Sequence, residues 1–259
     1  MAEHDPYVHP GGDKLKFYSI TDRGSVRAEN QDYAFVTEVR SRACLAAVLC
    51  DGMGGAHGGK LASELAVSAY MAELRRTLIG STEKKPEIAR AMDLACKAAN
   101  NVVYGYSVAN TESAGMGTTL VAATIRRRTA EIINIGDSRA YLIERKSIRQ
   151  ITRDHSFVED MVLLGKLTPE EAAHHPQKNL ITRAVGVDPT VEADHYTVSL
   201  RLGSKILLCS DGLSNTLTED KLLSFCLESR HPDRICRRLI SAALDRGAGD
   251  NITAVVIQG

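Results

Sequence analysis

The sequence predicts an α+β fold in which helix pairs cover a sandwich of sheets. Strand patterns come in groups with short links, which favours antiparallel pairing. Helix patterns also come in groups, instead of alternating singly with strands as they do in parallel α/β folds. The chain of 259 residues has ordinary apolar and charged content, so one large core can be buried.

Strand signals are short runs that are β-branched or alternate between apolar and polar residues, and turn residues separate them. They occupy residues 15–22, 33–39, 44–50, 117–126, 130–136, 139–144, 195–200, 205–210 and 252–257.

Helix signals are clearest at 60–79 and 87–108, where apolar residues recur on one face. A third helical region at 219–246 contains Pro232. Proline lacks the N–H that a helix interior needs, so a helix must stop or restart there.

The chain predicts one folded domain, 15–259, preceded by a polar leader, 1–14, that lacks periodicity. Residues 154–186 differ from their surroundings and predict a peripheral flap of two short helices. The second of these begins at a capping box, with Thr168 as N-cap and Glu171 at its third position. Such irregular insertions are often functional, so we expect the flap to tune substrate entry.

Composition excludes several classes of partner. Lysine plus arginine equals aspartate plus glutamate, at 32 each, so net charge gives no reason to expect binding to nucleic acid or to an anionic membrane. The three arginines at 126–128 fall between two strand signals and predict a solvated hairpin turn. No apolar run approaches the ~20 residues of a membrane span. The six cysteines include no CxxC pair, which favours a reducing, cytoplasmic location.

Four apolar strand-like runs end or begin at an aspartate beside a small residue. These are Asp51, Asp137, Asp211 and Asp250. A single Asp-Gly is most often a turn. Four at buried strand ends point to a shared site, because ionised carboxylates in one pocket need a multivalent cation to compensate their charge. Ligands made only of oxygen favour magnesium or manganese.

Other chemistry fits the sequence less well. Residues 54–60 nearly match a phosphate-binding loop, but Leu61 replaces the hydroxyl that would ligate magnesium. Residues 136–140 are similar to a serine-nucleophile elbow, yet a strand pattern follows where that elbow needs a helix. His174 and His175 are expected to be a surface pair. No residue stands out as a covalent nucleophile.

The segment before the second strand combines Arg27 with Asp32. An arginine can bind two phosphate oxygens with its fork of N–H groups, and a carboxylate can hold a cation directly or through water. By itself this pairing is weak evidence, because a surface ion pair is the default explanation.

With that segment included, the chain resembles the metal-dependent protein Ser/Thr phosphatases of the type 2C (PPM) family, bacterial branch. The resemblance runs from about residue 15 to the C-terminus. The motifs that carry it, in order, are RAENQD, LCDGMGGAHGG, AGMGTTL, NIGDSRAYL, ITRDHS, LLGKLTPEEAAHHPQKNLITRAVG, LLCSDGLS and GDNITAVV.

The resemblance implies two antiparallel sheets packed as a central β-sandwich between helix pairs, a four-layer αββα architecture. It also implies a centre of two manganese or magnesium ions and a third, weaker ion. The implied ligands of the two ions are Asp51, the Gly52 carbonyl, Asp211 and Asp250, with Asp32 acting through water; Asp137, shared with Asp211, would bind the third ion, and Arg27 the substrate phosphate.

The activity implied is one-step hydrolysis of phosphoserine and phosphothreonine on proteins by a metal-activated bridging water, opposing bacterial Ser/Thr kinases. The expected partners are those kinases and their substrates, and the expected state is a monomer. Met53 departs from the family pattern, because many relatives have a histidine there that is proposed as general acid; His57 is nearby. Two alternatives stay open: a catalytically silent module that binds phosphoproteins or kinases, and a switch phosphatase for one regulatory protein.

Overall fold

The computed structural model describes residues 15–39, 43–80 and 87–259, so the predicted leader lies outside the described residues. Two antiparallel sheets form the centre. Sheet A has the strand order β1 (Lys16–Asp22), β11 (Ile252–Gln258), β10 (Lys205–Cys209), β7 (Arg139–Glu144) and β8 (Ser147–Gln150). Sheet B has the order β2 (Asp32–Val39), β3 (Cys44–Met53), β5 (Leu120–Arg126), β6 (Thr129–Ile135) and β9 (Asp194–Ser199), with the short β4 (Gly117–Thr118) beside β3.

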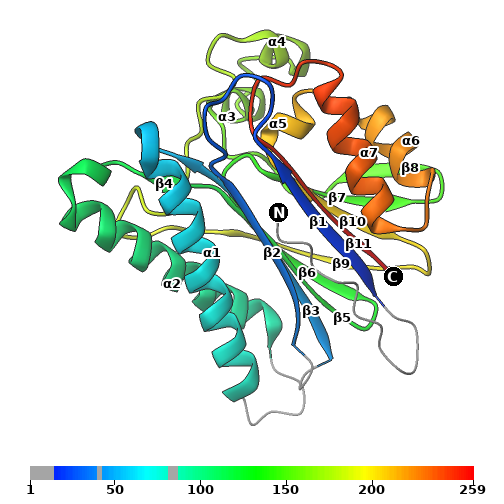
Figure 1. The fold of residues 1–259 in the computed structure, drawn as a ribbon, viewed down its shortest axis with the longest axis horizontal. Helices are drawn as coiled ribbons and strands as arrows, with labels where there is room; N and C mark the ends of the chain where they lie inside the picture. The colour runs from blue at the N-terminus through cyan, green and yellow to red at the C-terminus, as the bar shows by residue number, and fades with distance from the viewer. Residues whose placement is uncertain (1–14, 40–42, 81–86) are drawn as a thin grey trace.

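Helices cover the outer face of each sheet, as Figure 1 shows. Sheet B packs against α1 (Gly55–Gly80) and α2 (Ile88–Ala109), and a short 3-10 turn, Thr111–Ser113, follows α2. Sheet A packs against α6 (Glu219–Leu227) and α7 (Pro232–Leu244). The four layers of helices, sheet, sheet and helices confirm the predicted fold class.

Three buried apolar clusters hold these layers together, because each sheet has an inner and an outer apolar face. The middle cluster joins the two sheets, with Leu49 and Val121 of sheet B facing Leu208 and Val255 of sheet A. The other two clusters lie between each sheet and its helices. The alternation of side chains along each strand divides them between the clusters.

Most predicted elements are present, with boundaries moved by a few residues. Pro232 does restart the helix, since it stands in the first turn of α7. The strand predicted at 44–50 continues through Met53, because β4 supplies hydrogen-bonding partners for its last residues. The prediction lacked β8 and the one-turn helix α5 (Asp211–Ser214), which are too short for a periodic pattern.

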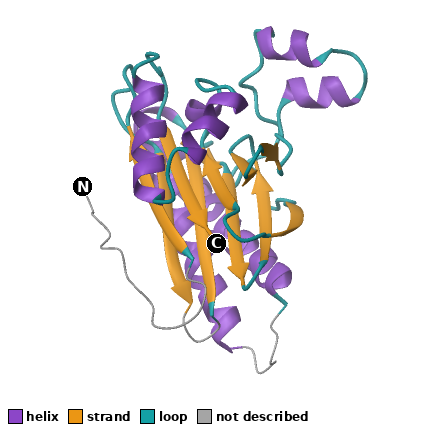
Figure 2. Ribbon diagram, turned by 90° about the vertical axis from the view of Figure 1, so that its right-hand side faces the viewer, coloured by secondary structure: helices purple, strands orange, loops and turns teal. Residues whose placement is uncertain are grey.

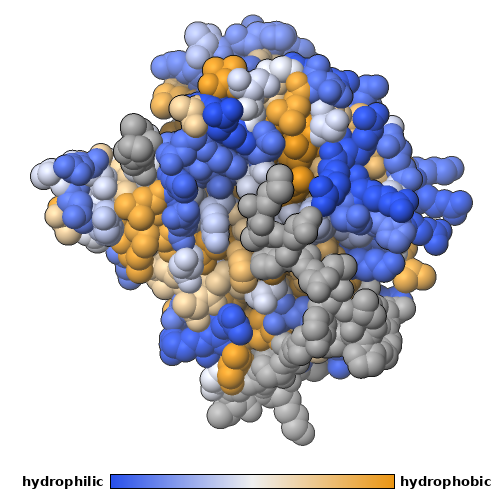
Figure 3. All heavy atoms as spheres, in the orientation of Figure 1, coloured by the Kyte–Doolittle hydropathy of each residue, from blue (hydrophilic) through white to orange (hydrophobic). Residues whose placement is uncertain are grey.

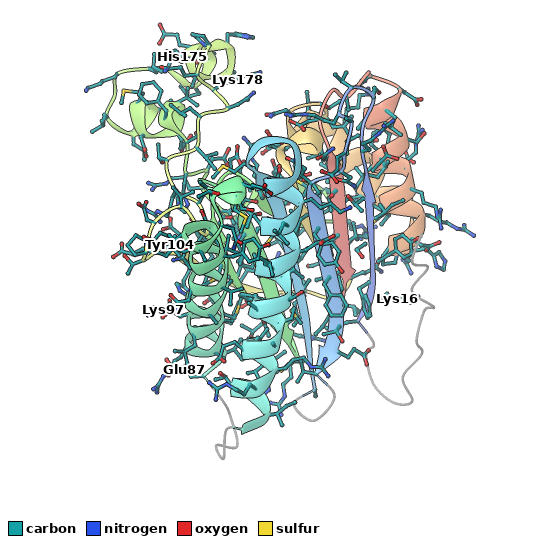
Figure 4. The ribbon with its side chains drawn as sticks, turned by 60° about the vertical axis from the view of Figure 1, so that its left-hand side comes forward. Lys16, Glu87, Lys97, Tyr104, His175 and Lys178 are labelled. Carbon is teal, nitrogen blue, oxygen red and sulfur yellow. The ribbon has the colours of Figure 1, made fainter. Side chains whose placement is uncertain are left out.

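The segment 154–186 contains two short helices, α3 (Phe157–Leu163) and α4 (Pro169–His174), that project beyond the ends of the strands (Figure 2). The predicted capping box of α4 is formed: the Thr168 side chain accepts from the Glu171 N–H, and the Glu171 carboxylate accepts from the Thr168 N–H. Figure 4 shows the half-buried His175 and the exposed Lys178 on this projecting flap, far from Lys16.

The remaining surface agrees with the composition. Hydrophilic side chains cover the side of the molecule where α6 and α7 lie (Figure 3). All six cysteines are buried as free thiols. Within the described residues, no helix is both long and apolar enough to cross a bilayer.

The contact between the sheets should dominate stability. Leu208 is 0% exposed, so Leu208→Ala should lower the free energy of unfolding by about 2–5 kcal/mol, because a buried cavity is left behind. Leu202 is 75% exposed, and Leu202→Ala should change the free energy of unfolding by less than about 0.5 kcal/mol. Chemical denaturation measures both variants, and equal effects would contradict the assigned core.

Candidate metal centre

A cavity of about 890 Å³ opens at the end of the sandwich where β3 and β10 finish and β11 starts. The loop between β1 and β2, helix α5 and the flap all lie toward this end in Figure 1. The sequence-predicted residues that line the cavity are Arg27, Asp51, Gly52, Asp137, Asp211 and Asp250. Asp32 is 5% exposed and is not among the lining residues.

Asp32 and Asp51 face each other directly across the β2–β3 pair. Like charges at opposite positions of two strands repel each other, so this register destabilises the ionised pair. The Asp32 Oδ2 atom accepts hydrogen bonds from the hydroxyls of Ser210 and Thr253, each at 2.7 Å. Both donors come from sheet A or its edge, so Asp32 also links the two sheets.

Asp211 and Asp250 reach the cavity from neighbouring strands of sheet A. Asp211 opens α5 just after β10, and Asn215 Nδ2 donates to its Oδ2 at 3.1 Å. Asp250 precedes β11. The two segments approach closely because position 212 is glycine: a Cβ on Gly212 would lie 2.0 Å from the Asn251 carbonyl oxygen.

Asp137 sits in the turn between β6 and β7. The turn starts at Gly136, whose φ of +99° is in the region that favours glycine. A Cβ on Gly136 would also lie 2.7 Å from the Thr119 side chain. Ser138, the serine of the elbow-like motif, is fully buried and shares a hydrogen bond of 2.7 Å with Thr119, so it is not an accessible nucleophile.

Burial and mutual repulsion raise the pKa values of these carboxyl groups. Burial raises the pKa of Asp32 to about 6 and that of Asp137 to about 7, and Asp211 adds repulsion to both. Burial, followed by the charges of Asp32 and Asp211, raises the pKa of Asp51 well above its usual range. The Asp211 pKa is raised by burial and by Asp250. The protein therefore concentrates negative charge where water cannot stabilise it.

The oxygen atoms that the cavity offers as ligands fit a divalent cation. The Oδ1 atoms of Asp32 and Asp211 are buried and have no hydrogen-bond donor in the described structure, except that a protonated Asp51 carboxyl could donate to either residue. When Asp51 is ionised, these oxygens face only other negative oxygens. A hard cation supplies the missing charge and accepts oxygen ligands without histidine or cysteine.

Protein side chains alone do not complete a coordination shell here. Within the described ranges, no three acidic, histidine or cysteine side chains form a ready-made ligand set. Magnesium and manganese sites commonly include waters and backbone carbonyls, and Mg²⁺ gives up its waters reluctantly. Gly52, whose carbonyl the family resemblance implies as a ligand, is one of the residues that line the cavity.

Close backbone packing explains the glycines around Gly52. A Cβ on Gly52 would lie 1.9 Å from the Gly59 carbonyl oxygen, so the end of β3 and the first turns of α1 touch through their backbones. Lys60, the lysine of the loop that resembles a phosphate-binding loop, lies 3.7 Å from Glu29 in an ion pair. The glycines therefore serve strand-to-helix packing, and the lysine is not directed at a phosphate. The His57 side chain lies outside the described atoms.

Arg27 lies on the rim of the cavity and its Nη2 donates to Asp250 Oδ2 at 2.8 Å. The Arg27 side chain is 56% exposed, so it is free to exchange this partner for another anion in the cavity. Its pKa is raised, chiefly by the hydrogen bond with Asp250. The arginine is thus a permanent cation that interacts with Asp250 and with the charges of Asp51 and Asp211.

Sequence reasoning missed Asn251 as a positioning residue, although the motif GDNITAVV contains it. The side chain is buried and ties the β1–β2 loop to the start of β11: Nδ2 donates to the carbonyls of Arg23 and Glu29 at 2.9 and 3.0 Å. Its Oδ1 accepts from the Gln31 N–H at 2.8 Å. Only the sequence adjacency to Asp250 could have indicated this role.

The chain matches the family described as Protein phosphatase 2C over residues 23–239, and it belongs to that family. It is 35% identical over 238 residues to the serine/threonine phosphatase stp of Listeria monocytogenes, covering 92% of this chain and 93% of that protein. It is 37% identical over 245 residues to the serine/threonine protein phosphatase PstP of Mycobacterium tuberculosis, covering 93% of this chain but 44% of PstP.

Solved structures agree with these relationships. The serine/threonine phosphatase Stp1 of Staphylococcus aureus superimposes with a TM-score of 0.86 at 33% identity, covering 99% of both chains. The catalytic domain of PstP in complex with two manganese ions superimposes with a TM-score of 0.81 at 34% identity, covering 94% of this chain and 97% of that one. These comparisons confirm the resemblance to the type 2C phosphatases, one of which, PstP, holds two manganese ions in its solved structure.

The raised pKa values predict how the metal-free protein responds to pH. An unfolded aspartate titrates near ~3.9, so between about pH 4 and 7 the folded protein holds protons on Asp32 and Asp137 that the unfolded chain has released. Stability should therefore fall as pH rises through this window. Thermal unfolding with a chelator should give a lower Tm at pH 8 than at pH 5.5.

Saturating manganese should abolish or reverse that decline, since the cation binds the ionised carboxylates. Asp137→Asn is the matched variant, and it should flatten the pH dependence of the metal-free protein. A metal-free Tm that rises from pH 5.5 to 8 would contradict the electrostatics described here.

Proposed function

We propose that this protein hydrolyses phosphoserine and phosphothreonine on other proteins by a metal-activated water. The observation that carries the proposal is the cavity in which several aspartates lie beside an exposed arginine, and in which one of them, Asp211, has a buried oxygen without a hydrogen-bond donor. Carboxylates bind the cations and the arginine binds the phosphate, so one cavity accommodates both charges. The phosphatase names of its relatives support the same activity.

We assign Asp51, the Gly52 carbonyl, Asp211 and Asp250 as ligands of two manganese or magnesium ions. Asp32 lies behind Asp51 and would act through water, and Asp137 would hold a third, weaker ion together with Asp211. The repulsion between Asp137 and Asp211 is consistent with such sharing. Divalent ions in such a centre lower the pKa of water and neutralise charge on phosphate oxygens.

The side chains of the protein then orient the phosphate and the ligand carboxylates. Arg27 receives the phosphate after leaving Asp250, whose charge is taken over by the cation. Ser210 and Thr253 hold one oxygen of Asp32, so its other oxygen stays directed toward Asp51. Met53 lines the cavity but its thioether carries no proton, so water protonates the leaving group. No phosphoenzyme would form, because the aspartates of the lining are assigned to the cations and the Thr119 hydroxyl is hydrogen-bonded to Ser138, which leaves water as the attacking group.

The flap supplies Asn179 and Ile181 to the cavity wall, and we propose that it tunes the entry of phosphoproteins. The substrates would be targets of bacterial Ser/Thr kinases, and the kinases themselves. Six buried free thiols support a reducing, cytoplasmic site of action. We propose that the protein acts there as a monomer.

Removing one ligand charge tests the metal site. In Asp51→Asn and in Asp211→Asn, manganese-dependent hydrolysis of an aryl phosphate should fall by on the order of 100-fold or more, since even residues behind the ligands cost 10–100-fold. The metal-free Tm at pH 8 should rise, because a repelling buried charge is gone. Retained manganese-stimulated activity in both variants would refute the assignment.

Assays with and without chelator separate the enzyme from a silent binding module, which would bind phosphopeptide equally well in both conditions and hydrolyse nothing. A panel of phosphoproteins separates a general phosphatase from one that acts on a single regulatory protein.

Arginine replacement tests phosphate recognition. Arg27→Ala should raise KM for a phosphopeptide by about 10-fold or more, the equivalent of ~1.5–3 kcal/mol for a charged hydrogen bond, with a smaller effect on kcat. Arg27→Lys keeps the charge but loses the two-pronged geometry, so its KM should lie between that of wild type and that of Arg27→Ala. An unchanged KM in Arg27→Ala would remove Arg27 from the phosphate site.

A further inference from the structure

The flap joins the body at a neck, which we define as residues 155–157 and 180–183. The two sides of the neck are held together by backbone hydrogen bonds, one of which runs from the Thr182 N–H to the His155 carbonyl at 2.9 Å. Ile181, on the returning side, lines the cavity. A residue of the neck that also contacts a ligand-bearing turn would connect the flap to the metal centre.

His155 makes such a contact, through two hydrogen bonds with one residue. Its backbone N–H donates to the Gly136 carbonyl at 3.0 Å, and its ring Nδ1 accepts from the Gly136 N–H at 3.0 Å. His155 is 2% exposed, so water does not compete for these bonds. Gly136 immediately precedes Asp137, and the pair of bonds therefore fixes the start of the turn that carries this carboxylate.

The opposite side of the ring is held as well. Because Nδ1 accepts from a backbone N–H, the ring proton belongs on Nε2, which lies 3.3 Å from Asp194 Oδ2. Arg183 Nη1 lies 3.2 Å from the same nitrogen and donates to Asp194 Oδ1 at 2.9 Å. Asp194 thus orients the imidazole, in the way that carboxylates orient the histidines of metal sites.

Packing alone does not explain this arrangement. An apolar side chain would fill the same volume, but it would leave the buried Gly136 N–H without an acceptor, which is unfavourable in a site that excludes water. The carboxylate behind the ring further selects the one tautomer that can accept from Gly136. In this series of contacts, Asp194 therefore orients His155, and His155 in turn fixes Gly136.

We propose that His155 is a positioning residue, which is oriented by Asp194 and couples the flap neck to the carboxylate of Asp137 by fixing the Gly136–Asp137 turn. The inference rests on the proposed function, in which Asp137 holds the weaker cation. It adds a route by which movement of the flap changes the geometry of that cation's ligand.

Two isosteric replacements separate the two sides of the ring. In His155→Asn, the side-chain oxygen takes the place of Nδ1 and can still accept from the Gly136 N–H, but the link to Asp194 is lost. In His155→Gln, the amide reaches the place of Nε2 and can still donate to Asp194, but no acceptor faces Gly136. His174→Gln, at an exposed position of the flap, is the control.

The first readout needs no metal. Hydrogen exchange of the Gly136 amide, resolved by NMR in the full-length metal-free protein, should be at least about 10-fold faster in His155→Gln than in wild type. In His155→Asn and in the control it should stay within about 3-fold of wild type. Equal exchange rates in the Gln and Asn variants would overturn the proposal.

The second readout is manganese binding by calorimetry. His155→Gln should weaken the weaker binding step by about 10-fold, within the usual range for residues behind a ligand, and leave the tighter step unchanged. Faster Gly136 exchange with unchanged manganese binding would contradict the ligand role of Asp137 and with it the coupling. If His155→Gln fails to fold, Asp194→Asn should accelerate Gly136 exchange instead, and a wild-type rate there would overturn the orienting role of Asp194.

Discussion

Repulsion between carboxylates that the fold brings together is the constraint on which this structure depends. Asp32 and Asp51 are cross-strand neighbours, and Asp211 and Asp250 approach them from the second sheet. Burial prevents water from relieving the repulsion, as the raised pKa values of Asp32 and Asp137 record. A divalent cation bound as we propose would remove this cost, so we expect stability and metal binding to depend on the same side chains.

The architecture makes the arrangement possible. Each sheet buries both of its faces, one against the other sheet and one against helices, and the resulting rigidity holds the strand ends at one edge. Asp32 belongs to sheet B but is held by Ser210 and Thr253 on the side of sheet A. The metal centre that we propose would therefore be built across the junction of the two sheets, where neither sheet could form it alone.

Polar contacts around this centre each position a different segment or side chain. Asn251 ties the loop that carries Arg27 to the strand that follows Asp250. His155 connects the flap neck to the turn that carries Asp137. Arg27 compensates the negative charge of Asp250 when no cation is bound. The helices of the flap project from the body, whereas Ile181 of the neck lines the cavity.

Local sequence patterns were enough to predict most of the secondary structure and to single out the aspartates as candidate ligands. The aspartates at strand ends, the helix restart at Pro232 and the capping box at Thr168 depend on neighbours in the chain, so local patterns reveal them. The contacts of Asn251 and His155, and the pairing of Arg27 with Asp250, were decided only by the tertiary structure. The hydroxyl of Thr253 meets Asp32 across 221 residues, and contacts of that range follow from the order of strands in the sheets, which no local pattern encodes.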